Sequence, residues 1–336
     1  MLGIQCHDVE VFSGQNTLMN NREYLMITFA KALPSRLAAV KTRVWIMGVM
    51  AFCALYSATA AHLDERLFFA VKTNWVENGS ETRALWLPEY QVRVDALPVE
   101  TVKDNLSGLT FDEDRDHLWA VINNPEELVA LDKNGTFMAR YPLAGFSDVE
   151  GVTYLGDNLL VLAEERQQAL VVLPVPEQPG ELQREDFASI SLKLGEADNA
   201  GFEGVGYDRQ GDRLFVVKEH SPRKLYEIRG VKGSLNGQMS LDIIDRSAWI
   251  EGIDMAVDLS SVHFDERTGH LVLLSDEAKM LVELDGQGQL VSFRSLWGGV
   301  AGLKSSVPQA EGVTLDARGN LYLVSEPNLF YALQSK

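Results

Sequence analysis

The chain has 336 residues and a formal net charge of −18, from 48 acidic and 30 basic side chains. The first 61 residues hold five basic and three acidic residues, so residues 62–336 carry 25 basic against 45 acidic side chains, a net charge of −20. Phosphate is repelled by such an acidic body, which argues against a nucleic-acid partner. The length allows one large domain plus an N-terminal extension.

Residues 1–43 show no strong pattern, and they are interpreted as a cytoplasmic tail or as the product of a start site assigned too early. An uncharged, mainly apolar segment follows at residues 44–61, with basic residues before it and acidic residues after it. This charge asymmetry predicts a signal-anchor helix in the bacterial inner (plasma) membrane, with the rest of the chain facing the periplasm. The alternative is a signal peptide cleaved near Ala60, which would release the protein into the periplasm.

Residues 62–89 are expected to form a linker, and the globular domain is predicted to span residues 90–336. The domain opens on one strand-like run, Y-Q-V-R-V-D-A from Tyr90, which precedes the first repeat. An early strand of this kind closes a ring of sheets when it pairs with the last strands of the chain. We therefore expect it to pair with the C-terminal strands.

A seven-residue phrase then recurs five times: N-L-S-G-L-T-F from Asn105, D-V-E-G-V-T-Y from Asp148, G-F-E-G-V-G-Y from Gly201, D-L-S-S-V-H-F from Asp258 and Q-A-E-G-V-T-L from Gln309. A second and a third apolar run follow each phrase. All are of strand length and bounded by turn residues, which predicts β-strands. Strand-only units repeating every 43–57 residues predict an all-β fold, a five-bladed β-propeller. The proline-containing stretch between Leu173 and Asn199 is interpreted as an insertion between blades.

These phrases resemble the SdiA-regulated family of bacterial envelope proteins. The most specific part is Q-A-E-G-V followed by V-S-E-P-N-L-F-Y near the C-terminus, and the similarity covers about residues 90–334. The resemblance implies a five-bladed β-propeller, distantly similar to NHL-repeat propellers, with a bound calcium ion. It implies no particular activity.

Two columns of residues carry the candidate chemistry. Aligning the repeats gives a first column of Ser107, Glu150, Glu203, Ser260 and Glu311, and a second of Asn123, Glu164, Glu219, Asp276 and Glu326. The first column begins one strand and the second ends the next, so antiparallel pairing brings both to one rim. Carboxylates this close repel each other unless a cation lies among them or some are protonated. Oxygen ligands without His or Cys suit Ca²⁺ or Mg²⁺ better than Zn²⁺. We predict a Ca²⁺ site formed by Glu150, Glu203, Glu311, Glu164, Glu219 and Glu326.

A simpler interpretation is that each glutamate only bonds backbone N–H groups of the next blade. Among the histidines, His220 follows Glu219 and could be a general base, a metal ligand or an exposed loop residue. His263 is expected to be packed or channel-facing. Two function classes follow. The first is a membrane-anchored periplasmic module that binds calcium and an unknown periplasmic ligand or protein. The alternative is a metal-dependent hydrolase of a phosphoester or lactone.

Overall fold

A computed structural model of the protein describes residues 42–60 and 84–335, apart from gaps at 193–200, 220–221, 236, 238–239, 252, 254–255 and 257. The chain divides into two compact units, Met1–Lys72 and Thr73–Lys336. In the first unit, the apolar segment forms helix α2 (Thr42–Ala60). Within the described part of the chain, no helix is long and apolar enough to cross a membrane. The predicted helix is thus present, whereas its passage through a membrane stays a prediction.

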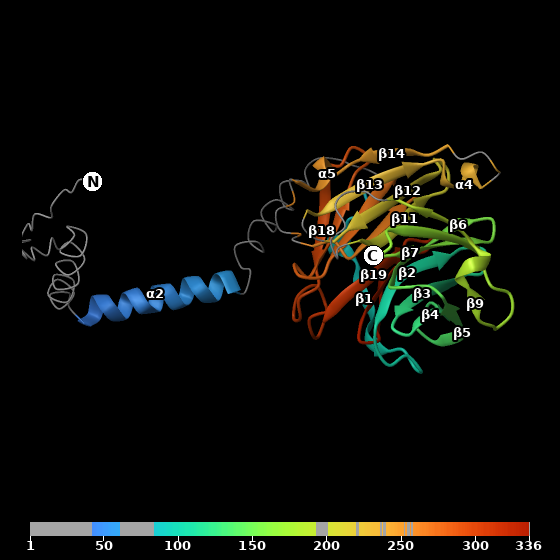
Figure 1. Ribbon diagram of the computed structural model, residues 1–336. Coiled ribbons are helices and arrows are strands. Elements are labelled where there is room, and N and C mark those ends of the chain that lie inside the picture. Colours follow the sequence, from blue (N-terminus) through green and yellow to red (C-terminus); the bar gives the residue numbers. More distant parts are fainter. Residues whose placement is uncertain are drawn as a thin grey trace, which may run out of the picture. The chain divides into compact units, whose positions relative to one another are not determined.

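The second unit is a ring of five antiparallel sheets, which confirms the predicted propeller (Figure 1). The innermost strands β2, β6, β11, β15 and β19 each contact the next, and β19 contacts β2, so that the ring is closed. These five strands begin with the recurring phrase and surround the central channel. The remaining strands of each sheet follow outward in chain order, apart from the one that closes the ring.

The first three blades contain the strands that the repeats predicted, together with short outer strands. Blade 1 consists of β2 (Leu106–Asp112), β3 (His117–Asn123), β4 (Glu126–Leu131) and β5 (Phe137–Ala144). Blade 2 consists of β6 (Val149–Gly156), β7 (Leu159–Glu164), β8 (Ala169–Pro174) and β10 (Ala188–Ser191). Blade 3 consists of β11 (Phe202–Asp208), β12 (Arg213–Lys218), β13 (Lys224–Arg229) and β14 (Asp242–Asp245). The short helices α4 (Val231–Ser234) and α5 (Ala248–Glu251) flank β14.

The last two blades complete the ring. Blade 4 consists of β15 (Ser261–Asp265), β16 (His270–Ser275), β17 (Met280–Leu284) and β18 (Leu290–Ser295). Blade 5 consists of β19 (Gln309–Leu315), β20 (Leu321–Glu326), β21 (Leu329–Gln334) and β1 (Gln91–Pro98). Strand β1 pairs antiparallel with β21, from Gln91 opposite Gln334 to Pro98 opposite Leu329. This pairing confirms the predicted closure by the early strand.

The stretch between Leu173 and Asn199 differs from its prediction as an insertion. It contains β10, which pairs with β8 and is the fourth strand of blade 2. It also contains β9 (Leu182–Gln183), which pairs in parallel with the outer strand β5 of blade 1, and the 3₁₀ turn η2 (Arg184–Asp186). The segment thus completes one blade and extends another.

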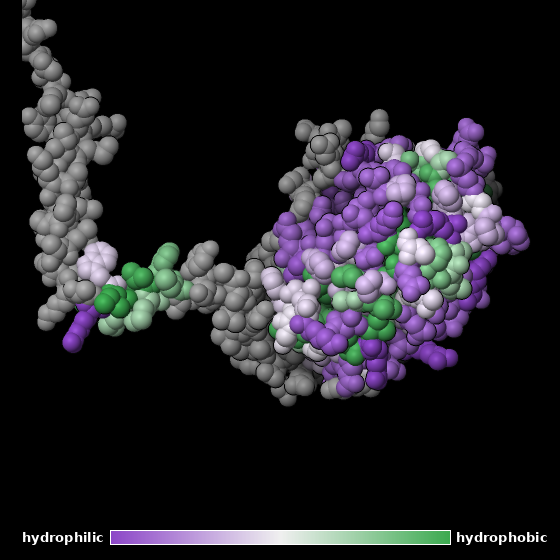
Figure 2. All heavy atoms as spheres, turned by 90° about the horizontal axis from the view of Figure 1, so that it is seen from below, coloured by the Kyte–Doolittle hydropathy of each residue, from purple (hydrophilic) through white to green (hydrophobic). Residues whose placement is uncertain are grey.

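Apolar side chains from neighbouring blades meet between the sheets. One cluster between blades 1 and 2 joins residues such as Trp119 and Tyr154, both nearly inaccessible to solvent. Between blades 3 and 4, the rings of Phe215 and Phe264 stack with their centroids 5.6 Å apart. Burying both faces of each sheet in this way stabilises blades that could not fold alone. The face of the propeller seen in Figure 2 is mostly hydrophilic, in keeping with the acidic composition.

The chain just before β1 belongs to the propeller and not to the expected linker. Residues 84–90, which we call the N-terminal strap, include the 3₁₀ turn η1 (Leu87–Glu89). The fully buried carboxylate of Glu283 in β17 accepts hydrogen bonds from the backbone N–H groups of Leu85 (2.7 Å) and Trp86 (3.1 Å). The buried guanidinium of Arg294 in β18 donates to the carbonyl oxygens of Leu87 and Tyr90. The strap is therefore fastened to blade 4 before the chain enters blade 5.

Candidate functional site

The recurring E-G-V phrase has a structural cause at its glycine. A Cβ atom built on Gly151 would lie 2.7 Å from the carbonyl oxygen of Glu203, and one on Gly108 would lie 2.5 Å from that of Glu150. No real Cβ tolerates such distances, so the glycines let the inner strands of adjacent blades approach closely. The residue before each glycine lies at the beginning of its inner strand, where the five strands converge.

Glu150 is held in place by two polar side chains of blade 1. The hydroxyl of Ser107 donates to Glu150 Oε2 at 2.7 Å, and the amide of Asn123 donates to Glu150 Oε1 at 2.6 Å. Ser107 and Asn123 are the blade 1 members of the two predicted columns, so the structure brings the columns together there. Burial raises the pKa of Glu150, and these two hydrogen bonds only partly offset it.

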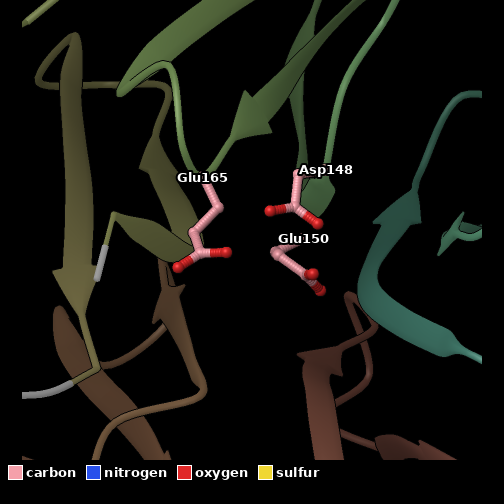
Figure 3. Close-up of side chains that lie close together, drawn as sticks. All are labelled: Asp148, Glu150 and Glu165. Carbon is pink, nitrogen blue, oxygen red and sulfur yellow. The ribbon is translucent and has the colours of Figure 1, made fainter. Parts of the chain in front are cut away.

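Three carboxyl groups of blade 2 lie closest to one another. Asp148, Glu150 and Glu165 each place an oxygen within 4.8 Å of the others (Figure 3). Burial, followed by the proximity of Asp148, raises the pKa of Glu165 to about 7 despite a hydrogen bond from the backbone N–H of Gly201. The guanidinium Nε of Arg166 lies 2.6 Å from Asp148 Oδ2, and its side chain is otherwise largely exposed. Within the described part of the chain, Arg166 is the one cation paired with this group, so the three carboxyl groups can carry more negative charge than it offsets.

Glu203 lies beside this group, at the beginning of β11. Its side chain is buried, with 9 % of the residue exposed, and no described residue forms a hydrogen bond or ion pair with its carboxyl group. Burial raises its pKa well above the usual range, and the charges of Glu150, Glu165, Glu219 and Glu311 raise it further. A buried acid surrounded by acids has no compensating partner among the described side chains.

Two half-buried glutamates of blade 5 complete the cluster. Burial, together with the neighbouring charges of Glu150, Asp276 and Glu326, raises the pKa of Glu311 to about 8. The pKa of Glu326 is raised by burial and by Asp104, Glu150 and Asp276. We call the whole set the acidic cluster: Asp148, Glu150, Glu165, Glu203, Glu219, Asp276, Glu311 and Glu326.

Glu164 lies outside the acidic cluster. Its carboxylate is fully buried, accepts a hydrogen bond from the backbone N–H of Ser147, and pairs with Arg184 at 3.0 Å. The cause is a register shift between Tyr154 and Gly156 in the pairing of β6 with β7. This shift places Glu165, not Glu164, at the position held by Glu219 and Glu326 in their blades.

Five of the six glutamates that converge here were therefore predicted from the repeats, whereas Asp148 and Glu165 were not. Aligning blade 2 on Leu160 instead of Leu159 would have found Glu165. The predicted residue His220 lies outside the described residues. All potential ligands of the acidic cluster are oxygen atoms, the donor type that Ca²⁺ and Mg²⁺ prefer.

Fold and site together define a five-bladed β-propeller with an acidic cluster at one end of its central channel. The family model of the SdiA-regulated proteins matches residues 82–334, and the chain belongs to that family. The resemblance seen in the sequence is thereby confirmed.

Several solved structures are similar at low identity. A streptogramin B lyase is 11 % identical, with a TM-score of 0.41, over 75 % of this chain and 100 % of the lyase. A luciferin-regenerating enzyme is 12 % identical, with a TM-score of 0.46, over 72 % of this chain and 95 % of that one. A chain of a nidogen/laminin complex is 12 % identical, with a TM-score of 0.42, over 66 % of this chain and 73 % of that one. Similarities this weak carry no argument about chemistry.

Proposed function

We propose that this protein is a periplasmic binding module that holds Ca²⁺ in the acidic cluster and presents the propeller to a ligand or protein, with residues 44–61 anchoring it in the inner membrane. Two observations support a binding role: the chain belongs to a family of β-propellers, and acidic residues recur at one position of successive blades. The anchor rests on the charge asymmetry around the apolar segment.

The observation that carries the calcium proposal is the buried carboxyl group of Glu203, which has no hydrogen-bond or ion-pair partner among the described residues. Burying an ionised carboxylate without a partner is costly, and four acidic neighbours increase that cost. The group can respond by binding a proton or by sharing a cation with its neighbours. A divalent cation would neutralise two charges at once, and carboxylates approach Ca²⁺ at ~2.3–2.6 Å.

The residues best placed to hold the cation are Asp148, Glu150 and Glu165, whose oxygens already lie within 4.8 Å of each other. Ser107 and Asn123 fix the orientation of Glu150, which is the role of outer residues in metal sites. The charges of Glu150, Glu165 and Glu311 contribute to the raised pKa of Glu203, which supports including Glu203 and Glu311 in the proposed site. Bound calcium would join blades 2, 3 and 5 and rigidify that end of the channel.

The test is thermal unfolding of the full-length chain and its Glu203→Gln variant, with Ca²⁺ and with chelator. Calcium at ~100 times its Kd adds about 2.7 kcal/mol, a rise in Tm on the order of 5–10 °C for a domain of this size. We expect Glu203→Gln to reduce this rise by at least about half, because a ligand charge is lost. Without metal, the variant should be equally or more stable, because one repulsive buried charge is gone.

The exposed residue Glu185 provides the control. Glu185→Gln removes the same charge from the surface and should leave the Tm unchanged, both with Ca²⁺ and with chelator. Two results together would contradict the proposal: a wild-type Tm that Ca²⁺ does not change, and a Glu203→Gln variant that is less stable with or without metal. In that case the glutamates would only connect neighbouring blades.

A further inference from the structure

A cavity of about 410 Å³ lies at the end of the channel opposite the acidic cluster. The acidic cluster surrounds the beginnings of the inner strands, whereas this cavity is lined by their last residues and the turns that follow. An inner strand of about six residues spans ~20 Å at ~3.3 Å per residue, so the two sites are well separated. The volume falls within the ~300–1,000 Å³ typical of small-molecule sites. We call it the mouth cavity.

Asp residues form the rim of the mouth cavity by capping the turns after the inner strands. Asp208 Oδ1 accepts hydrogen bonds from the backbone N–H groups of Gln210 and Gly211. Asp316 Oδ1 accepts them from Arg318 and Asn320 in the equivalent turn. These caps fix the loops from which the lining side chains project, so the cavity has a rigid rim.

Each arginine of the mouth cavity is already paired with a carboxylate. Arg209 of blade 3 binds Glu266 of blade 4 through two N–H groups at 2.7 Å each, and its remaining nitrogen contacts Glu113 of blade 1. It passes over Gly156, where blade 2 has no side chain. Arg267 pairs with Asp265 at 2.9 Å. The two cations are therefore held in place by at least three anions.

The carboxylate of Asp316 also lines the cavity, and the other lining groups are neutral. Thr110 and Thr153 contribute hydroxyl groups, and Phe111 and Tyr154 contribute aromatic rings. His263 lies deep in the channel, as the sequence analysis allowed, with Nδ1 3.3 Å from the hydroxyl of Thr314. Burial lowers the pKa of His263 to about 4, so its ring is uncharged near neutral pH and offers one donor and one acceptor.

We propose that the mouth cavity binds an uncharged, polyhydroxylated ligand of the size of a monosaccharide or disaccharide. Ion pairs with Glu113, Glu266 and Asp265 neutralise the two arginines but do not exhaust the hydrogen-bonding positions of these side chains. A guanidinium has five N–H donors and a carboxylate about four acceptor positions. Hydroxyl groups both donate and accept hydrogen bonds, so they match the unused donors and acceptors of these ion pairs. The aromatic rings offer apolar surface to the ring face of a sugar.

Charged ligands fit this cavity less well. Four acidic and two basic side chains line it, so an anion meets net negative charge. A cation would have to displace Arg209 from Glu266, where two hydrogen bonds hold it. A neutral ligand requires no such exchange.

This inference goes beyond the proposed function, because the mouth cavity shares no residue with the acidic cluster and needs neither calcium nor the membrane. The experiment uses the full-length chain and saturation-transfer NMR with glucose, galactose, N-acetylglucosamine, maltose and cellobiose, followed by titration of any that bind. Glucosamine, glucuronate and glucose 6-phosphate are the charged comparison. Each measurement is made with Ca²⁺ and with chelator, so that failure of one proposal is distinguishable from failure of the other.

Gln210→Trp tests the location, because Gln210 is an exposed turn residue on the lining of the mouth cavity. The matched control is Gln287→Trp, the same substitution in an exposed outer hairpin that does not line it. We expect at least one neutral sugar to bind, and its charged derivative to bind at least about tenfold more weakly. Gln210→Trp should weaken binding of the neutral sugar at least about tenfold, and Gln287→Trp should leave it unchanged. The inference is overturned if no neutral sugar binds, if a charged derivative binds equally well, or if both variants bind like the wild type.

Discussion

At the scale of single residues, the acidic cluster was predictable where the repeat alignment was unambiguous. Glu203 and Glu311 each precede the glycine that lets adjacent inner strands approach, so their positions follow from the phrase itself. Glu165 was missed because β7 begins at two successive leucines and two successive glutamates stand at its end. A bulge between Tyr154 and Gly156 sets the register of β6 with β7, and apolar periodicity does not reveal it. The hydrogen bonds that orient Glu150 depend on side-chain rotamers, which a sequence does not specify.

The adjacent residues Glu164 and Glu165 give a residue-scale prediction. Glu165→Gln should reduce the calcium-induced rise in Tm and leave the metal-free protein about as stable, because Glu165 borders other acids. Glu164→Gln should lower the free energy of unfolding by about 2–3 kcal/mol with or without calcium, because it weakens a buried pair with Arg184. Thermal unfolding of both variants checks this. Equal responses to calcium would show that the register assignment has no functional meaning.

At the scale of elements, the closing strand β1 was predictable and the N-terminal strap was not. The strand-like run before the first repeat belonged to no repeat, so it had no pairing strand of its own. The open edge of the last blade, strand β21, supplied that pairing strand. The strap, in contrast, is recognised by Glu283, which lies 198 residues after Leu85. Its own sequence carries no regular pattern, so only the folded blade 4 reveals its place. Strand β10 was missed because four residues, A-S-I-S, are too short to show periodicity.

The strap leads to a prediction at this scale. Glu283→Ala should lower the free energy of unfolding by about 3–5 kcal/mol, because two buried backbone N–H groups lose their acceptor. It should also accelerate hydrogen exchange selectively in residues 84–90. Urea unfolding and mass-spectrometric hydrogen exchange measure the two effects, with Glu185→Ala as the surface control. Unchanged exchange in the strap would mean that Arg294 and apolar contacts hold it without Glu283.

At the scale of the whole molecule, the number of blades followed from the number of repeats, because each four-stranded unit buries its faces only against neighbours. The direction of the chain across a membrane is a separate prediction. A reporter enzyme that works only in the cytoplasm, fused after Lys336, should be inactive, and a periplasmic reporter at the same point should be active. Activity of the cytoplasmic reporter would show an inverted orientation or an unused anchor.

The raised pKa values of the acidic cluster predict how the stability of the whole protein depends on pH. Burial and neighbouring charges raise the pKa to about 7 for Glu165 and about 8 for Glu311. A raised folded-state pKa stabilises the fold below the unfolded-state value, ~4.3 for Glu, and this stability is lost as pH rises through the folded-state value.

Without metal, the Tm should therefore fall between pH 6 and 8.5. A loss of ~1–2 kcal/mol in the free energy of unfolding corresponds to a fall in Tm on the order of 5 °C, at ~2–4 °C per kcal/mol. Calcium should remove most of this fall, because it neutralises the carboxylates that lose their protons, so its stabilising effect should grow over the same interval. Glu311→Gln should flatten the metal-free profile, since one titrating group is gone, while Glu185→Gln should not. A metal-free Tm that stays constant or rises toward pH 8.5 would mean that these carboxyl groups are already ionised at neutral pH, and that the acidic cluster stores no repulsion for a cation to relieve.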